Sequence, residues 1–482
     1  MAFRTLHRCR PIPAVVLAVA GAIAFSPPVA GQAAASFEPA PARAYDFPLT
    51  IESIMRGPEL VGQSPAGIRW SDDGRWVYFR WRPGGAEWWE ERELYRVPAE
   101  GGDPERLDEE TADRLAPVLA RGDVSPDGRY RVTSADGDLH LIERATGEIR
   151  QLTDTDEREF VPSFSGDGES VHFRRGRNLY AFDLEDDAIR QLTYVAEGPE
   201  EGEEEAEGHR AFLEEQQLEL FEHLRVRERR RARDSARAER LDDEPEPLHL
   251  ARGERVSSLD AEPGGRYVVV TATAGATGAE RTDIPRWITR SGYTENTEMR
   301  AKVGDEQSTS RLGLIEAETG DVTWLDLSAS PEGSESGGTD ESEEEAAGTG
   351  PLAVASFVGW NDSGSHGLVF AVDADYKTWR LYALDGATRE LTLLDRHRDE
   401  AWVGGPCFGF GGASCIGWFP DDGEGLPRAW YVSEETGFAH LYVIDADGGN
   451  RRALTGGEWE VLNARIPEGW DAFLLHTSEV SP

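Results

Sequence analysis

The serine residues that could act as nucleophiles in this chain of 482 residues are not in the setting that serine hydrolases use. An α/β-type hydrolase carries its nucleophile in a Gly-x-Ser-x-Gly turn between a strand and a helix. Ser64, Ser365 and Ser414 have glycines nearby, but not at both required offsets. A Gly-rich phosphate-binding loop after a strand is also missing from the sequence. We therefore predict that these residues include no catalytic nucleophile.

Adjacent carboxylates, which often serve as general acids and bases, occur as three pairs in predicted turns. The pairs are Asp72-Asp73, Asp421-Asp422 and Glu434-Glu435. Because polar turn residues usually face water, we interpret all three pairs as solvated. The histidines are scattered, and no Cys/His spacing is typical of a metal site, so we expect neither a metal nor another cofactor.

The two cysteines of the C-terminal part bracket a predicted hairpin tip. Cys407 and Cys415 flank a glycine-rich stretch that begins with Phe408. In an oxidising compartment the two thiols could pair across this tip. Two buried free thiols are the alternative.

A small β unit recurs along the chain. Each copy has a short strand, a turn of the Asp-Gly type, a strand with an aromatic residue and two further strands. The six copies begin near Ile68, Val124, Phe164, Val256, Val354 and Trp418. Four-stranded units at a period of about 40 residues are typical of a β-propeller, in which neighbouring blades cover one another's faces. We predict an all-β propeller with six blades and part of a seventh, an incomplete ring of seven or eight, rather than a row of separate sandwiches.

Two insertions interrupt the predicted propeller, which we place at 64–482. The first, 197–247, contains the helix-forming stretch His209–Arg240 and is interpreted as a helical arm. Its leucine stripe, formed by Leu213, Leu220 and Leu224, predicts either a solvated helix or an element that docks on a partner or forms a homodimer. The second insertion, 328–350, is rich in Ser, Gly and Glu and predicts a disordered acidic loop.

The N-terminal residues have the pattern of an export signal. Basic residues are followed by the apolar run Ala14–Phe25 and then by small residues, so we predict a signal peptide over 1–31 and a lead-in segment over 32–63. The apolar run would make about 18 Å of helix, which is shorter than the roughly 30 Å hydrocarbon layer. We expect a periplasmic or extracellular protein without a later membrane span.

The charge of the chain limits its partners. Asp and Glu together number 91 against 50 Lys and Arg, which gives a formal net charge of −41. Nucleic acid is therefore not expected as a partner, because phosphate contacts need basic side chains.

Two motifs near the C-terminus resemble a known family. Residues 433–442 read SEETGFAHLY and residues 454–461 read LTGGEWEV. They resemble Ser-Glu-x-x-Gly-x-x-His-Leu-Tyr and Leu-Thr-x-Gly-x-Trp-Glu-Val in the N-terminal propeller of dipeptidyl-peptidase IV-type serine peptidases, within the prolyl oligopeptidase family. Residues 300–304 resemble a further motif of the family more loosely. The resemblance extends from about Ile68 to the end of the sequence.

The resemblance implies a function for this chain, although the sequence differs from the family pattern at two points. In that family the propeller gates access to a following α/β-hydrolase domain, and a Glu pair binds the free amino terminus of the substrate. This sequence ends before any hydrolase pattern, and its nearest Glu pair by order is Glu214-Glu215 in the helical arm. The resemblance thus implies the gating propeller of an exported dipeptidyl-peptidase-like enzyme, inert alone and with a peptide substrate only when joined to a hydrolase domain. The alternative is a stand-alone periplasmic propeller that binds a protein or ligand as a scaffold.

Overall fold

The computed structural model describes residues 50–55, 63–82, 90–196, 198, 222–241, 245–302, 305–327, 352–409, 412–421, 425–467, 469–470 and 472–479. The chain divides into two compact units, and the first comprises Met1–Gln63 with Pro83–Trp89. Its described part includes the one-turn helix α1 (Ile51–Ile54). The predicted signal peptide and the predicted acidic loop lie outside the described residues.

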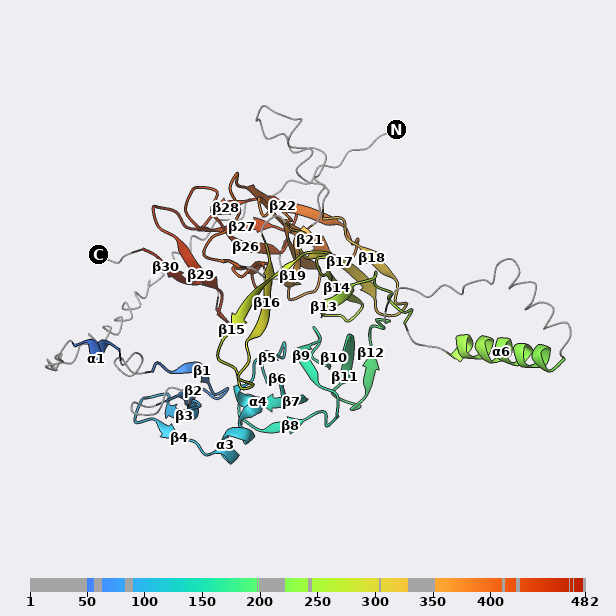
Figure 1. Cartoon of the computed structure of the whole chain (residues 1–482), viewed down its shortest axis with the longest axis horizontal. Helices are drawn as coiled ribbons and strands as arrows, with labels where there is room; N and C mark the ends of the chain where they lie inside the picture. Colours follow the sequence, from blue (N-terminus) through green and yellow to red (C-terminus); the bar gives the residue numbers. More distant parts are fainter. Residues whose placement is uncertain are drawn as a thin grey trace, which may run out of the picture. The chain divides into compact units, whose positions relative to one another are not determined.

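The second unit, Ser64–Arg82 with Glu90–Pro482, is built from small antiparallel sheets (Figure 1). Its described residues form six four-stranded sheets, called here the first to the sixth in chain order. The first three contain β1 (Ala66–Trp70), β2 (Trp76–Trp81), β3 (Glu93–Pro98) and β4 (Glu105–Arg106); β5 (Gly122–Val124), β6 (Tyr130–Ala135), β7 (Asp138–Glu143) and β8 (Ile149–Gln151); and β9 (Glu159–Phe164), β10 (Ser170–Arg175), β11 (Asn178–Asp183) and β12 (Ile189–Gln191).

Among the last three of these sheets, the fourth and fifth contain strands of eight or nine residues. The three sheets contain β13 (Glu254–Ala261), β14 (Tyr267–Ala274), β17 (Thr309–Glu316) and β18 (Val322–Trp324); β19 (Leu352–Trp360), β20 (His366–Asp373), β21 (Thr378–Asp385) and β22 (Leu391–Arg398); and β25 (Ile416–Trp418), β26 (Arg428–Ser433), β27 (His440–Asp445) and β28 (Arg452–Ala453). The all-β prediction is confirmed, and each of the six sequence units forms one of these sheets.

Smaller elements connect or extend the four-stranded sheets. The described two-stranded sheets are β15 (Arg281–Arg286) with β16 (Glu295–Ala301), β23 (Phe408–Gly409) with β24 (Gly412–Ala413), and β29 (Val461–Arg465) with β30 (Leu474–Thr477). The other described helices are α3 (Glu109–Arg114), α4 (Ala116–Leu119) and α6 (Glu222–Leu241). In the part of the chain that the structure describes, no helix combines the length and the apolar character that a membrane span needs.

A shared hydrogen-bonded turn joins the first two strands in each of the first three sheets. The hydroxyls of Ser71, Ser125 and Ser165 donate to the Asp two residues later, at 2.5 to 2.6 Å. Each hydroxyl also accepts the backbone N–H five residues later, at 2.9 Å. Gly74 and its two equivalents have φ between 69° and 75°, a left-handed conformation that glycine adopts without strain. The Asp-Gly signal in the sequence therefore corresponds to a specific turn.

Both faces of the fourth and fifth sheets are buried. On β14, Val268 and Val270 pack in one cluster with residues of the third sheet. Tyr267 and Val269, which point to the opposite face, pack in another cluster with residues of the fifth sheet. Strand β20 divides in the same way, because Leu368 and its alternate neighbours pack against the sixth sheet. Consecutive sheets therefore cover one another face to face.

The turns of neighbouring sheets also touch. The Gly166 N–H in the third sheet donates to the Pro263 carbonyl in the fourth, at 2.7 Å. A Cβ on Gly166 would lie 2.9 Å from Pro263 Cβ, and one on Gly364 in the fifth sheet would lie 3.0 Å from Pro263 Cδ. Glycine is required at these two turns because the adjacent turn occupies the space of a side chain.

The fourth sheet carries an inserted hairpin that the sequence analysis did not predict. β15 and β16 pair with each other between β14 and β17, and every residue of β15 is exposed (Figure 1). Trp287, Ile288 and Tyr293 at its tip are 76%, 95% and 79% exposed. The hairpin therefore presents large apolar side chains to water.

Candidate functional site

The turns that carry two of the three carboxylate pairs contact a neighbouring sheet. The solvated interpretation is wrong for Asp72, whose side chain is largely buried, whereas Asp421 is exposed. Asp72 in the first sheet accepts two hydrogen bonds of 2.7 Å from the Arg131 guanidinium of the second sheet. Asp421 accepts hydrogen bonds from Asn361 Nδ2 and the Ser363 N–H of the fifth sheet, each at 3.0 Å. The turns meet the neighbouring sheet, so their carboxylates join sheets. Asp422 lies outside the described residues.

The third pair, Glu434-Glu435, separates into two different environments. Glu435 forms an ion pair with Arg451. Arg451 Nη2 also lies 3.0 Å from Asp395 Oδ2, and its Nε donates to the Tyr431 hydroxyl at 2.8 Å. The Tyr431 hydroxyl in turn donates to Asp395 at 2.6 Å, and burial together with the Asp395 charge raises the pKa of Tyr431. Glu435 is therefore a member of a closed network in which its charge is neutralised.

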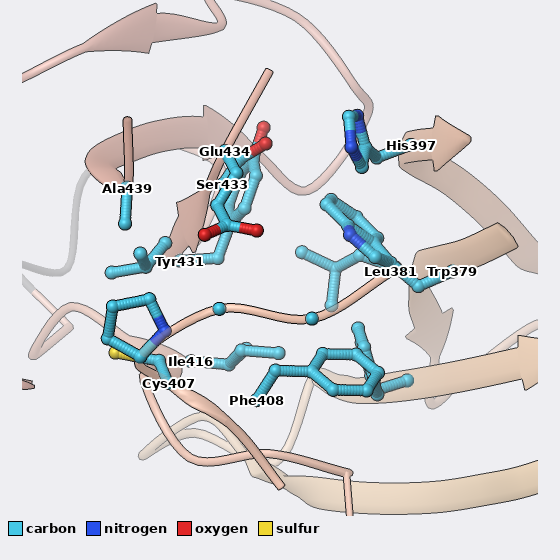
Figure 2. A pocket seen from close by; sticks show the side chains of 15 residues that line it. Trp379, Leu381, His397, Cys407, Phe408, Ile416, Tyr431, Ser433, Glu434 and Ala439 are labelled. Atoms are coloured by element: carbon cyan, nitrogen blue, oxygen red, sulfur yellow. The ribbon is translucent and has the colours of Figure 1, made fainter. Parts of the chain in front are cut away.

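Glu434 lines a pocket between the fifth and sixth sheets (Figure 2). Ser433 and Glu434 lie on one side of it, and Trp379 and His397 lie across from them. Further aromatic walls come from Phe370, Phe408 and Tyr431. The pocket thus combines one carboxylate with several aromatic side chains in a largely apolar lining.

The electrostatic setting of Glu434 disfavours its charge. Partial burial raises the pKa of its carboxyl, and the charges of Glu460 and Asp399 raise it further. The carboxyl group packs on the backbone of Gly405, where a Cβ would lie 2.7 Å from the Glu434 carboxyl carbon. Gly405 has φ of 119°, a backbone conformation that favours glycine at this point.

Ser433 is the second polar side chain of the pocket. It is 3% exposed, and its Oγ is buried without a hydrogen-bond partner among the described residues. Such a group costs free energy unless something hydrogen-bonds to it. Sequence analysis could have found this residue only through the 433–442 motif, because nothing in its composition distinguishes it from a serine in an ordinary turn.

The disulfide between Cys407 and Cys415 borders the same pocket. The two cysteines, whose sequence separation is 8, form this bond with a Cα–Cα distance of 5.4 Å. Cys407 lines the pocket between Pro406 and Phe408. The bond therefore holds the segment that forms one wall opposite Glu434.

His440 in the 433–442 motif holds the following loop rather than facing the pocket. Its Nε2 lies 3.0 Å from the Gly457 carbonyl oxygen, and its Nδ1 lies 3.2 Å from Thr455 Oγ1. Its ring contacts Trp459 edge to face, with centroids 5.2 Å apart. The two motifs, although separated in sequence, are thus joined by their own side chains, and this gives the His and Trp a structural role.

Ser365 and Ser414, which the sequence analysis did not accept as nucleophiles, form no catalytic triad among the described residues. Ser365 Oγ lies 3.1 Å from His366 Nδ1, but His366 Nε2 is 3.8 Å from Asp385 Oδ2, too far for the hydrogen bond that would orient the ring. Ser414 donates to the Cys407 carbonyl at 3.2 Å. Within the described residues, no group of three or more His, Cys, Asp or Glu side chains could hold a metal.

The residues predicted to bind a substrate amino terminus, Glu214 and Glu215, lie outside the described residues. So do Leu213 and Leu220 of the predicted stripe. Helix α6 begins at Glu222, inside the predicted helical stretch. Its arginines of described exposure, among them Arg225 and Arg229, face water. The two glutamates therefore stay a prediction.

A comparison with protein families gives a match over part of this chain. Residues 263–471 match the family described as Dipeptidyl peptidase IV (DPP IV) N-terminal region. This segment is therefore similar to a dipeptidyl peptidase IV N-terminal region. The resemblance inferred from the two motifs is confirmed there, since residues 433–442 and 454–461 both fall within the match. The residues that line the Glu434 pocket all fall within this match.

Solved structures of dipeptidyl peptidases are similar to the chain. The crystal structure of Porphyromonas gingivalis dipeptidyl peptidase 4 has 15% identity and a TM-score of 0.49, covering 87% of this chain and 50% of that one. A putative dipeptidyl aminopeptidase IV from Bacteroides ovatus has 13% identity and a TM-score of 0.41, covering 83% and 48%. The chain spans about half the length of these structures. A comparison with curated proteins gives no match.

Proposed function

We propose that this chain supplies the substrate-gating propeller of an exported dipeptidyl-peptidase-like serine peptidase, with the α/β-hydrolase domain coded outside these 482 residues. The observation that carries the proposal is the match of 263–471 to the dipeptidyl peptidase IV N-terminal region. In the proposal the hydrolase domain contributes the reacting Ser, His and Asp, and the propeller selects which peptides reach them.

We propose further that the six four-stranded sheets are blades arranged around one axis, with β29–β30 beginning a seventh. Supporting this arrangement, hydrophobic clusters join the third sheet to the fourth, the fourth to the fifth and the fifth to the sixth. Another cluster joins the sixth sheet to β29–β30 through Trp430, Leu441 and Val461. Sheets that bury both faces against neighbours form a ring without needing separate cores.

Peptidase assays on two polypeptides, the 482-residue chain and a longer one, test the proposed function. We expect the 482-residue chain to leave X-Pro-nitroanilides intact. A product that continues into the coding region after Pro482 is expected to cleave them, with inhibition by a serine-directed reagent. Cleavage by the 482-residue chain itself, blocked by that reagent, would contradict the proposal. So would unrelated sequence in the coding region that follows.

Gating is tested by removing hydrogen bonds between two blades in the longer, active polypeptide. Asp421→Ala removes hydrogen bonds to Asn361 and to the Ser363 N–H. We expect it to raise the rate on long peptides relative to an X-Pro-nitroanilide. The matched control is Asp447→Ala, because Asp447 is an exposed turn residue of the same sheet. An unchanged ratio in Asp421→Ala would show that the sheets do not restrict access.

The proposal includes a homodimer. The hairpin β15–β16 leaves Trp287 and Ile288 in water, and exposed apolar groups of this kind mark association surfaces. Sedimentation of the chain and of a Trp287→Ser/Ile288→Ser variant measures this directly. A dimeric chain with a monomeric variant supports it, and a monomeric chain at all concentrations rules it out.

A further inference from the structure

We propose that the pocket containing Ser433 and Glu434, called here the 433/434 pocket, binds a primary ammonium group at the end of an aliphatic chain. The inference is separate from gating and from the hydrolase reaction. It rests on one carboxylate and one hydroxyl that have no protein partner among the described residues, inside an aromatic pocket.

The carboxylate is distinguished by its lack of a partner. Three other partly or fully buried acidic groups among the described residues are paired: Asp72 with Arg131, Asp373 with Arg380 and Glu159 with Arg175. No hydrogen bond or ion pair reaches the Glu434 carboxyl from the residues that the structure describes. Instead it packs on Gly405, with Glu460 and Asp399 adding negative potential. A cation placed here would relieve repulsion that the fold leaves uncompensated.

The hydroxyl supplies the second, independent observation. Ser433 Oγ is buried, lines the same pocket and has no hydrogen-bond partner in the described part of the chain. An ammonium has three N–H donors and no acceptor, so it can donate to the carboxylate and to this oxygen together. A neutral apolar guest would leave both acceptors unsatisfied.

The walls favour a cation on a short apolar stem over an anion or a hydrated metal ion. Trp379, Phe370 and Phe408 contribute aromatic surface, whose π electrons attract cations. The described lining contains no Lys or Arg that could bind an anion. One carboxylate and one hydroxyl are too few protein oxygens for Ca²⁺, which takes six to eight oxygen ligands.

Titration of the chain with matched probes tests the inference. The cationic probe is N-acetyl-lysine-N-methylamide, and the neutral control is N-acetyl-norleucine-N-methylamide, which keeps the aliphatic stem without the ammonium. Ligand-observed NMR at about 0.15 M salt limits diffuse attraction to the acidic surface. We expect saturable binding of the lysine probe and none of the norleucine probe. Equal binding of both, or no binding of the lysine probe up to 50 millimolar, overturns the proposal.

Variants locate the binding. Glu434→Gln keeps the side-chain size and removes the charge, and we expect it to weaken binding about tenfold or more. Ser433→Ala should weaken it about threefold. The matched control is Glu400→Gln, an exposed carboxylate beside Asp399 that does not line the pocket, and its affinity should be unchanged. Equal losses in Glu434→Gln and Glu400→Gln would show diffuse charge attraction and overturn the site.

Two more measurements separate failure of folding from failure of binding and identify the source of the amine. Glu434→Asp retains the charge but withdraws it by one methylene, so a folded variant with intermediate affinity supports the site; unchanged affinity overturns it. Cadaverine carries the same type of ammonium without a peptide backbone. If cadaverine binds as tightly as the lysine probe, the pocket binds free amines. If it binds more weakly, the pocket recognises lysine side chains of peptides.

Discussion

Strands β26–β27 in the sixth sheet and strands β15–β16 in the inserted hairpin are both antiparallel pairs, but their environments are opposite. Most residues of β26 and β27 are buried, and their side chains pack toward the fifth sheet on one face and toward β29–β30 on the other. Every residue of β15 is exposed. Backbone pairing therefore makes a hairpin in both places, whereas neighbouring sheets decide which hairpin becomes core.

Charged side chains are buried and paired in the stacked sheets but exposed to water in the hairpin. In the stacked sheets a charge sits at a face that another sheet covers, so it needs a partner: Arg380 is 0% exposed and binds both oxygens of Asp373, at 2.6 and 3.2 Å. In the hairpin, charges such as Asp283 remain in water. Substitutions should therefore have large effects in the first region and small effects in the second.

The largest expected effect comes from the buried ion pair in the fifth sheet. Asp373→Asn removes the carboxylate that binds the buried Arg380 guanidinium, and we expect the free energy of unfolding to fall by about 3 kcal/mol. Denaturant unfolding measures it. The control Asp373→Leu/Arg380→Met removes both charges and should recover most of the loss. A single variant as stable as the parent would show that this face is not closed by the neighbouring sheet.

Acid should destabilise the stacked sheets through His172 of the third sheet. Burial is the main cause that lowers the pKa of His172 to about 4. The charge of Arg190 lowers this pKa further, whereas the charge of Asp167 raises it. The folded pKa lies below the ordinary value near 6.5, so the unfolded chain takes up the proton first as the pH falls. Stability contributed by this residue is complete above about pH 6.5 and is lost toward pH 4.

Between pH 7.5 and 4.5 this linkage amounts to about 2.5 kcal/mol. Denaturant unfolding at the two pH values measures it, with His172→Gln as the control that lacks the titrating ring. We expect the parent to lose this much more stability than the variant. Equal losses would mean that His172 is protonated in the folded protein and that the stack is open to water there.

The disulfide beside the 433/434 pocket should contribute less than the buried ion pair of the fifth sheet. Cys407→Ser/Cys415→Ser releases a short loop, and the chain-entropy account gives a loss of about 2.5 kcal/mol. Thermal unfolding with and without reductant measures the same quantity on the parent chain. An unchanged midpoint in both experiments would show that the pocket wall is fixed by packing alone.

The smallest effect is expected in the inserted hairpin. Trp287→Ser/Ile288→Ser changes side chains that are 76% and 95% exposed, so the unfolding free energy of the monomer should change by less than about 0.5 kcal/mol. Unfolding at a protein concentration low enough to keep the chain monomeric measures it. A loss above 1 kcal/mol would show that the hairpin is covered within one chain, which would erase the contrast with β26–β27.

Part of the candidate site was accessible to sequence reasoning. The 433–442 and 454–461 motifs marked the segment that forms the edge of the pocket, and the cysteine spacing marked its wall. The separate roles of Glu434 and Glu435 were not accessible, because their surroundings come from other strands: Asp395 lies on β22, and Gly405 lies in the loop after it. The hairpin β15–β16 was also missed, because its strands carry exposed polar residues without apolar alternation.

The sequence by itself determined the local units of this protein. Alternating apolar residues set the strands, and the Ser-x-Asp-Gly hydrogen bonds and left-handed glycines set the turns, because these interactions join residues at most five positions apart. The tertiary structure alone decided which carboxylates are neutralised and which remain free. Asp72 meets Arg131, 59 residues away, whereas Glu434 meets a glycine backbone. Such partners depend on how one sheet faces the next, and no short-range pattern records that distance.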